Sequence, residues 1–343
     1  MGDGVIGLST AFELARANAT VVLVGAERGG AASTAAAGLL APLVDTLPLA
    51  VRPFFKASLD KFPSFVERLN KYDSTLEIVR GVIEVRGHDH AVPSNSRPLS
   101  PGEIAAIQPG LHAPRGALFH HDDGAVDNVR LVAALRRAIS VEPNVLWLHE
   151  PAVRVQAGST HATVTLRDGT DIEAAWAVLA AGAWSPAIAG LPRALPVSPL
   201  KGQMLSLEAR DVRHAIMGDV YLVPRRNELA VGATVEQAGF DVSLDDQALD
   251  RLRTAAVAML PALRDARVVR RWSGIRPATP DLLPIVGPDP DSARLVYACG
   301  HGKNGILLAP ETASAVASVV SGGPPNTPIH PFSIDRFIES AAK

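Results

Sequence analysis

The sequence opens on a glycine pattern that strongly limits what the chain can fold into. Gly2, Gly4 and Gly7 fit G-x-G-x-x-G, and apolar residues at helical spacing follow directly over residues 5–18. A short β-branched run at residues 20–24 is typical of a strand. In such a unit, backbone N–H groups and the positive end of the helix dipole bind a pyrophosphate. Glycine clusters also make ordinary turns, but with this helix and strand the pattern predicts a dinucleotide-binding unit.

Two parts that such a unit normally has are not found at their expected places. A central strand of the parallel sheet should precede Gly2, where only Met1 stands, and its absence would leave backbone groups unpaired. We expect the natural chain to begin several residues upstream; the alternative is a rearranged sheet. The acidic residue that binds the ribose would fall at Val24 or Gly25, and neither can accept from it. Glu27 is close enough to replace it, unless it is a surface glutamate without a role.

Hydrophobic periodicity divides the rest of the chain into helices and strands. Helical spacing recurs over residues 51–69, 128–139, 245–259 and 306–320. Strand-like runs occupy residues 76–85, 163–166, 174–180, 204–207, 220–223, 229–231 and 295–298. The mixture predicts the α/β class, with a Rossmann-like nucleotide-binding unit whose pieces are separated by an α+β unit with an antiparallel sheet. The proline-rich residues 322–331 are expected to form a surface arm.

The composition favours a small-molecule ligand over a nucleic acid or a membrane. The chain has 47% hydrophobic and 20% charged residues and a formal net charge of −2. Its longest nearly uninterrupted apolar stretch, residues 174–184, is shorter than the roughly 20 residues that cross a bilayer. No secretory signal is recognisable, and the single cysteine, Cys299, cannot form an internal disulfide, so we expect a cytoplasmic protein. The length of 343 residues suffices for two domains, and the oligomeric state stays open, a homo-oligomer included.

A second informative segment consists almost entirely of small residues. Residues 29–40 read Gly-Gly-Ala-Ala-Ser-Thr-Ala-Ala-Ala-Gly-Leu-Leu. A flat ring system can lie against a backbone only where side chains are nearly absent, and this segment offers such a surface. An ordinary alanine-rich helix would have a similar composition, so the segment alone does not decide between the two.

Further motifs along the chain carry a resemblance to a known family. Residues 178–185 read Val-Leu-Ala-Ala-Gly-Ala-Trp-Ser, 201–204 read Lys-Gly-Gln-Met, 272–277 read Trp-Ser-Gly-Ile-Arg-Pro, and 299–306 read Cys-Gly-His-Gly-Lys-Asn-Gly-Ile. With residues 29–40, they resemble the glycine oxidase group of the D-amino-acid-oxidase family of FAD-dependent oxidoreductases. The resemblance extends in order over nearly the whole chain, which is more specific than any single motif.

This resemblance implies an FAD cofactor and a division of the chain. An FAD-binding domain would comprise residues 1–43, 131–204 and 273–343, interleaved with a substrate domain of residues 44–130 and 205–272. The backbone around Ala152 and Val153 would face the adenine. The implied cofactor-binding residues are Gly2, Gly4, Val5, Ile6, Gly7, Glu27, Ala32, Ser33, Ala37, Gly38, Leu39, Val153, Gly182, Trp184, His301, Gly302, Lys303, Asn304, Gly305, Ile306 and Leu307.

The resemblance also implies a substrate site with three residues. Arg276 occupies the position of the arginine that binds the substrate carboxylate, for which a planar guanidinium is well suited. A structural salt bridge is the alternative role for Arg276. Tyr221 matches a tyrosine that lines the pocket, with a core tyrosine as the alternative. Lys303 stands where an arginine is common in the group, so the charge is kept without the bidentate fork.

The implied reaction is the oxidative deamination of glycine, sarcosine or a small D-amino acid. A hydride would pass from Cα to flavin N5, and oxygen would take the electrons to give hydrogen peroxide. Positioning would supply most of the catalysis, so we expect no general base. The imine product would hydrolyse or serve thiazole formation for thiamine. Two alternatives remain open: a dehydrogenase of the same fold that uses a quinone or carrier, and a flavin-binding or fold-only protein without turnover.

Two other groups of residues are expected to have no such chemistry. His120-His121-Asp122-Asp123 has metal-ligating residue types, but neighbours on a strand point to opposite faces, so no metal site is expected. Cys299 is expected to be a buried free thiol rather than a point of flavin attachment.

Overall fold

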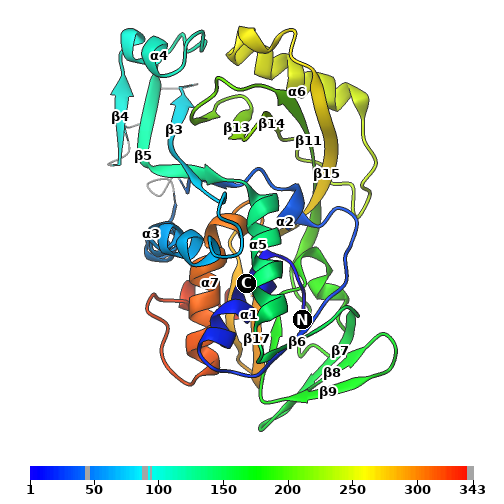
Figure 1. Cartoon of the computed structure of the whole chain (residues 1–343). Helices are drawn as coiled ribbons and strands as arrows, with labels where there is room; N and C mark the ends of the chain where they lie inside the picture. Colours follow the sequence, from blue (N-terminus) through cyan, green and yellow to red (C-terminus); the bar gives the residue numbers. More distant parts are fainter. Residues whose placement is uncertain (43–46, 87–91, 93–94, 338–343) are drawn as a thin grey trace.

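The glycine-rich N-terminus leads directly into helix α1 (Val5–Arg16), as the pattern predicts. The structure is a computed structural model that describes residues 1–42, 47–86, 92 and 95–337. Helix α1 is apolar on nearly all sides because it packs between α5 (Asn128–Val141) and α7 (Gly305–Val320). Helix α3 (Arg52–Leu69) packs on α7 and α5 from the other side. These four helices form the lower part of the molecule in Figure 1.

The parallel sheet beside these helices consists of two pieces. In one piece, β1 (Val21–Val24) pairs with β6 (Val145–Leu148) in parallel. In the other, β10 (Ala177–Leu179) pairs in parallel with β17 (Ser292–Cys299), which pairs antiparallel with β16 (Ile285–Asp289). No described strand pairs with both pieces.

Met1 and Gly2 connect the two pieces through backbone hydrogen bonds. The N–H of Gly2 donates to the Val24 carbonyl at 2.8 Å, and the N–H of Ala180 donates to the Met1 carbonyl at 2.8 Å. Gly2 has a φ of 106°, and a Cβ at this position would overlap the Ala180 carbonyl, so glycine is required. The glycine turn therefore lies between β1 and β10, where the sequence predicts a central strand.

A large curled sheet forms the upper part of the molecule in Figure 1. Its strand order is β15-β11-β14-β13-β12-β3-β5-β2, with β4 paired to β5, and only β12 and β3 pair in parallel. The strands are β2 (Leu39–Leu40), β3 (Ile78–Val85), β4 (Ser96–Leu99), β5 (Ala117–Val126), β11 (Ser198–Glu208), β12 (Ala215–Met217), β13 (Tyr221–Arg225), β14 (Glu228–Gly232) and β15 (Val268–Ala278).

Short helices and a small sheet complete the fold. Helix α4 (Pro101–Ile107) begins with a capping box, and α6 (Asp246–Met259) contributes with it to the core on the outer face of the large sheet. A separate antiparallel sheet contains β7 (Ala152–Ala157), β8 (Ala162–Leu166) and β9 (Asp171–Ala174). The remaining turns of helix are α2 (Ala32–Ala35) and the 3₁₀ segments η2 (Gly182–Ala187), η3 (Pro261–Leu263), η4 (His330–Phe332) and η5 (Ile334–Phe337).

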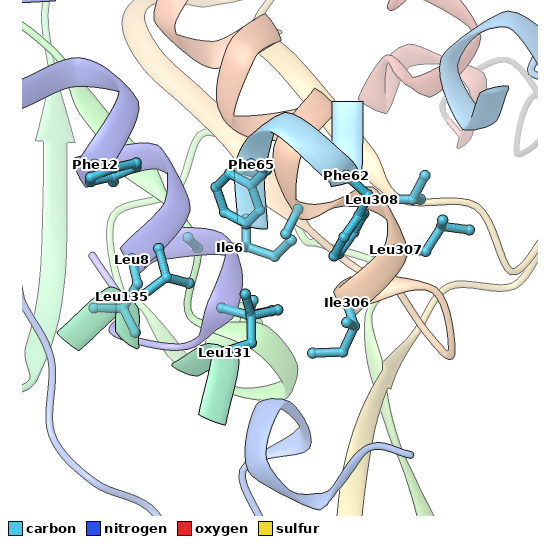
Figure 2. Packing of buried hydrophobic residues seen from close by; sticks show 14 of the residues in the cluster. Ile6, Leu8, Phe12, Phe62, Phe65, Leu131, Leu135, Ile306, Leu307 and Leu308 are labelled. Atoms are coloured by element: carbon cyan, nitrogen blue, oxygen red, sulfur yellow. The ribbon is translucent and has the colours of Figure 1, made fainter. Parts of the chain in front are cut away.

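The main hydrophobic core lies between the helices of the cofactor-binding part. Figure 2 shows Phe12 of α1, Phe65 of α3, Leu131 of α5 and Leu307 of α7 in this core. The expected division of the chain places α3 in the substrate domain, whereas α3 shares its core with α1 and α7. The division itself stays a prediction.

Two long strands run through both parts of the molecule. Strands β11 and β15 pair from Ser198 opposite Ala278 to Leu207 opposite Val268, with one register shift after Ser206, and Met204 lies opposite Trp272 in that pairing. The expected boundaries at 204/205 and 272/273 therefore fall side by side within one continuous ladder. A domain border at these positions would fall within two paired strands rather than in a loop. The two parts are therefore joined by paired strands.

The mixed α/β fold agrees with the predicted class, and most predicted elements lie close to their expected places. The prediction of one strand over residues 174–180 is wrong, because β9 ends at Ala174 and β10 covers only Ala177–Leu179. The run at 204–207 is part of the longer β11. The segment 29–40 contains the four-residue helix α2 and ends in strand β2, so it is not an ordinary long helix. In the expected surface arm, exposed residues predominate, but the chain turns inward directly after it, where Phe332 is fully buried. Within the described residues, no helix is long and apolar enough to cross a membrane.

Candidate cofactor and substrate site

The start of α1 provides free backbone donors for an anion. Its N-cap, Gly4, makes no side-chain cap, and the N–H of Val5 donates to Ser33 Oγ at 2.9 Å. Among the described residues, the N–H groups of Ile6 and Gly7 have no hydrogen-bond partner. A Cβ on Gly7 would overlap the Gly2 carbonyl, so the turn and the helix can approach only through glycine. This arrangement suits a phosphate group at a helix N-terminus.

The small-residue segment lies across this turn and against the large sheet. The N–H of Ile275 donates to the Gly30 carbonyl, and the N–H of Val126 donates to the Gly38 carbonyl at 2.9 Å. Gly38 has a φ of 86°, and a Cβ there would overlap the Val126 carbonyl. A Cβ on Gly274 would likewise meet Ala35. The segment is therefore built for close backbone approach, and a surface almost without side chains results.

The turn before α7 closes the site from a third direction. The N–H of Gly302 donates to the Pro277 carbonyl at 2.8 Å, which places this turn next to the Arg276 strand. His301 is buried, its Nε2 lies 3.0 Å from Thr312 Oγ1, and burial lowers its pKa to about 3. His301 is therefore neutral at pH 7. The N-cap of helix α7, Asn304, makes no side-chain cap, so the positive end of the helix dipole is open.

Arg276 lies in a space that two backbone carbonyls and a glycine create. Its Nη1 donates to the carbonyls of Thr234 at 3.1 Å and Lys201 at 3.4 Å. A Cβ on Gly202 would overlap the guanidinium, so the glycine makes this position of the side chain possible. No carboxylate of the described residues forms an ion pair with Arg276. The guanidinium is thus held by neutral groups and keeps donors for an external anion.

Tyr221 lies beside Arg276 in the same region. Burial raises the pKa of Tyr221, and the neighbouring Arg276 opposes this effect. The Tyr221 hydroxyl lies 3.8 Å from Met204 Sδ, and a Cβ on Gly232 would overlap the tyrosine ring. Gly202 and Gly232 therefore make room for a guanidinium and a protonated hydroxyl that face one common space.

A hollow of about 450 Å³ extends from the glycine turn along the end of β1. Asp3, Glu27, Arg136 and Trp147 are among the residues that line it. The Glu27 carboxylate accepts from Arg136 Nη1 at 2.8 Å and is 82% exposed. Glu27 is thus placed at the hollow and is accessible to a ligand, as its predicted role requires.

The other predicted cofactor residues fall into four groups. Trp184, in η2 after Gly182, stacks on Phe240 with ring centroids 5.4 Å apart, and the Arg28 guanidinium lies 5.2 Å from the Trp184 ring. Lys303 is exposed in the turn before α7, and Val153 is partly exposed on β7. The side chains of Val5, Ile6, Ile306 and Leu307 belong to the hydrophobic core, so only their backbone is available to a cofactor. Ala32 and Ser33 lie in α2, Ala37 and Leu39 pack against the inner face of the large sheet, and Gly305 begins α7.

Three features of the chain fit FAD. The uncapped N-terminus of α1 suits the pyrophosphate, the hollow at Glu27 suits the adenosine end, and the small-residue segment suits a flat ring. The first and the third feature lie on elements that hydrogen-bond to each other, since the N–H of Val5 in α1 donates to Ser33 in α2.

Comparison with known proteins also indicates an FAD-binding protein. The family described as FAD dependent oxidoreductase matches residues 1–319. The chain belongs to this family. It is 34% identical to the glycine oxidase of Pseudomonas putida over 348 residues, which cover 95% of this chain and 94% of that protein. The glycine oxidase of Geobacillus kaustophilus has a similar solved structure, with a TM-score of 0.89, 28% identity and coverage of 97% and 96% of the two chains.

A longer relative matches only in part of its length. The bifunctional protein ThiO/ThiG of Synechocystis is 35% identical over 360 residues, which cover 98% of this chain and 53% of that protein. This chain thus spans about half the length of the bifunctional relative. The family assignment confirms that the protein is an FAD-dependent oxidoreductase and that its cofactor is FAD.

Several residues that shape this site escaped the sequence analysis. Gly202 and Gly232 lie in strands, where only the structure shows which side chains they make room for. Arg225 and Asn128 bind the small-residue segment from distant parts of the chain. Trp272 lies in a recognised motif, but its bond to the Ala35 carbonyl is visible only in the structure.

The four-residue group at 120–123 is divided between the interior and the surface. His120 and Asp123 are buried with 4.0 Å between Nδ1 and Oδ2, whereas His121 and Asp122 are exposed. His120 Nε2 lies 2.7 Å from Glu84. In the part of the chain that the structure describes, no three His, Cys, Asp or Glu side chains are placed to hold a metal ion. Cys299 is buried, and burial raises the pKa of its thiol to about 12.

Proposed function

We propose that this protein catalyses the FAD-dependent oxidative deamination of glycine or another small amino acid, including sarcosine and small D-amino acids. The observation that carries the proposal is the setting of Arg276, a guanidinium without a carboxylate partner among the described residues, beside Tyr221. A small zwitterion offers few groups for recognition besides its carboxylate. The glycine oxidases among the relatives support the same substrate class.

The residues of this site divide into an anchor and its surroundings. The Arg276 guanidinium would donate two parallel hydrogen bonds to the substrate carboxylate. The Tyr221 hydroxyl stays protonated at neutral pH, because burial raises its pKa, and can donate a further bond. Lys303 is exposed in the turn before α7, which a backbone hydrogen bond from Gly302 to Pro277 joins to the Arg276 strand, and it would add positive charge. Together these groups would hold the carboxylate and thereby fix the direction of the Cα–H bond.

The N-terminus of α1 and the small-residue segment would hold FAD, which would supply two-electron chemistry as the acceptor of a hydride from Cα, with oxygen proposed as the final acceptor. The protein contributes position, which is worth several kcal/mol when the reacting atoms lie about 3–3.5 Å apart. The open N-terminus of α7 offers partial positive charge where negative charge accumulates on reduction. His301, in the turn before α7, is neutral at pH 7 because burial lowers its pKa to about 3, and it supplies no proton. The substrate amine must be neutral when it reacts.

The product imine has two fates in this proposal. It hydrolyses to an oxo acid and ammonia, or it serves thiazole formation for thiamine, which the names of the ThiO/ThiG relatives support. A dehydrogenase that passes electrons to a quinone or carrier would use the same anchor. A protein that holds flavin without turnover is the third alternative.

One spectroscopic experiment separates these alternatives. The purified protein is expected to show the absorption bands of oxidised FAD. Anaerobic glycine should bleach them, and admission of air should restore them within seconds. A bleached protein that does not recolour would support the dehydrogenase. A flavin that none of glycine, sarcosine and the small D-amino acids bleaches would contradict amino-acid oxidation.

Variants of Arg276 test the anchor itself. Arg276→Ala should lower kcat/KM for glycine by several orders of magnitude, and Arg276→Lys should lower it less, because lysine keeps the charge without the fork. FAD content should stay near normal in both. An amine without a carboxylate is the control, since its turnover never used the anchor. Wild-type kcat/KM in Arg276→Ala, or loss of its flavin, would contradict the assignment and leave Lys303 as the next candidate.

A further inference from the structure

Arg225 is a buried cation that no part of the reaction so far uses. It ends strand β13 of the large sheet, is only 7% exposed and forms no ion pair with any described carboxylate. Glu228, the nearest candidate on the paired strand, instead binds Arg270. Burial lowers the pKa of Arg225, and Asp127 and Glu228 oppose this effect from a distance. A buried charge without a counterion costs free energy, so its position calls for a compensating role.

All the contacts of this guanidinium lead to the small-residue segment. Its Nη2 donates to the carbonyls of Ala36 at 2.8 Å and Ala37 at 3.4 Å, and to Asn128 Oδ1 at 2.7 Å. Trp272 Nε1 donates to the preceding carbonyl, that of Ala35, at 2.9 Å. Three consecutive carbonyls of the segment therefore point at donors from the large sheet.

The same network continues to the glycine turn. Asn128 accepts from Arg225 with its oxygen and donates from Nδ2 to the Ser33 carbonyl at 2.7 Å. Ser33 Oγ in turn accepts from the N–H of Val5, the first residue of α1. Arg225 thus fixes the segment relative to the phosphate end of the cofactor site as well as to the substrate sheet.

The direction of the carbonyls determines the direction of the N–H groups. In a trans peptide, C=O and N–H point to opposite sides. Because Arg225 holds the Ala36 and Ala37 carbonyls, the N–H groups of Ala37 and Gly38 point away from it. Among the described residues, neither N–H has a partner, whereas the N–H of Ala36 is bound to the Ala32 carbonyl. Two adjacent donors are thereby left for a ligand that lies on the segment.

We propose that Arg225 is a positioning residue for the flavin, which holds the Ala36 and Ala37 carbonyls so that the N–H groups of Ala37 and Gly38 donate to the bound ring system. Its charge also polarises these two peptides, which strengthens their N–H groups as donors. Stronger donors stabilise the reduced flavin, which carries more electron density than the oxidised form. This proposal requires FAD and does not depend on which amino acid is oxidised.

The test compares Arg225→Met with Arg270→Met. The Arg270 guanidinium also lies over Trp272, at 5.1 Å against 5.8 Å for Arg225, but it is exposed and makes no contact with the small-residue segment. Three quantities are measured: the dissociation constant of FAD, the midpoint potential of the bound flavin, and the melting temperature of the FAD-free protein. Both variants remove one cation beside the same indole, so their difference reports the contacts with the segment.

We expect Arg225→Met to weaken FAD binding by about 10- to 100-fold, the effect of losing a hydrogen bond to a charged group. Its flavin should also have a lower midpoint potential. Arg270→Met should match the wild type in both. If Arg225→Met lowers only the melting temperature of the FAD-free protein, or if both variants shift alike, the proposal is wrong.

A second pair of variants covers the case in which Arg225→Met does not fold. Arg225→Lys keeps the charge and a donor, whereas Arg225→Gln keeps a donor without the charge. The lysine variant should lie closer to the wild type than the glutamine variant in both FAD affinity and midpoint potential. Equal values for the two variants would overturn the role of the charge and with it the proposal.

Discussion

At the residue scale, single glycines decide where the substrate anchor can lie. The Arg276 guanidinium occupies the space where a Cβ on Gly202 would stand, and both residues lie on strands that pair with each other. The guanidinium is the mobile end of a long side chain, so an added methyl group would displace it and leave the strands in place. A displacement of about 1 Å at a reacting site can cost on the order of 100-fold in rate.

We therefore predict that Gly202→Ala lowers kcat/KM for glycine by about 10- to 100-fold while FAD content and melting temperature stay close to the wild type. Steady-state kinetics and thermal unfolding of the same preparation measure these quantities. Gly102→Ala is the matched control, because nothing lies within 4 Å of a Cβ at Gly102. Unchanged kinetics in Gly202→Ala would mean that the position of the guanidinium is not critical for substrate binding.

A second residue-scale feature is the buried carboxyl of Asp123. It is 1% exposed, neither oxygen has a hydrogen-bond partner among the described residues, and burial raises its pKa to about 6. The ordinary value is 3.8, so between about pH 4 and 6 the folded state binds more protons than the unfolded state. The stability of the fold therefore falls as the pH rises through this window, and the charged carboxylate remains costly above it.

Asp123→Asn should remove this dependence, because the amide is neutral at every pH. Relative to the wild type, the variant should gain up to roughly 3 kcal/mol at pH 8 and nothing at pH 4, since one pKa unit corresponds to about 1.4 kcal/mol. Urea unfolding at the two pH values measures the difference. The exposed neighbour provides the control, and Asp122→Asn should show no such gain. A gain of equal size at both pH values would point to packing rather than to the charge.

At the scale of elements, periodicity located the helices better than the strands. The helical run at 245–259 corresponds to α6 within one residue, because its apolar face covers the large sheet. Strand β5 escaped prediction, since the exposed His121 and Asp122 interrupt its buried residues. Strand β15 escaped because arginines occupy its exposed positions. Along a long strand of a curled sheet, the burial of each face changes. Apolar and polar residues therefore do not alternate regularly in the sequence.

The loop after β1 carries the proposed substitute for a ribose ligand. Glu27 lines the hollow beside the glycine turn and is paired with Arg136. If Glu27 accepts from the ribose hydroxyls, Glu27→Ala should weaken FAD binding by about 1–3 kcal/mol, the usual value for a hydrogen bond to a charged group. Titration of the FAD-free protein with FAD measures this. Arg136→Met removes the ion pair but keeps the carboxylate, so an equal loss in both variants would assign the effect to the pair instead.

At the scale of the whole molecule, the sequence sufficed for the fold class and for the family, and it left the network between the two parts undetermined. Arg276 and Tyr221 can be proposed from the sequence because each lies within a short motif. Arg225 cannot, because its partner Ala36 is 189 residues away along the chain. Local patterns record which elements form, whereas contacts between distant elements depend on how the strands are ordered in the large sheet. The N–H groups of Ala37 and Gly38, which have no partner among the described residues, are oriented by such distant contacts.

The joined strands also make a prediction about cooperativity. Because β11 and β15 pair across the expected domain border with a regular register there, the helical part and the large sheet should unfold together. Phe62 lies in the core of the helices and Leu222 in the core outside the large sheet, and both are fully buried. Phe62→Ala and Leu222→Ala should each cost on the order of 2–5 kcal/mol. Each should shift one common transition, seen alike by far-UV circular dichroism and by flavin fluorescence on release of FAD. If Leu222→Ala instead showed an early loss of secondary structure with flavin still bound, the two parts would unfold separately, and the continuous strands would not couple them.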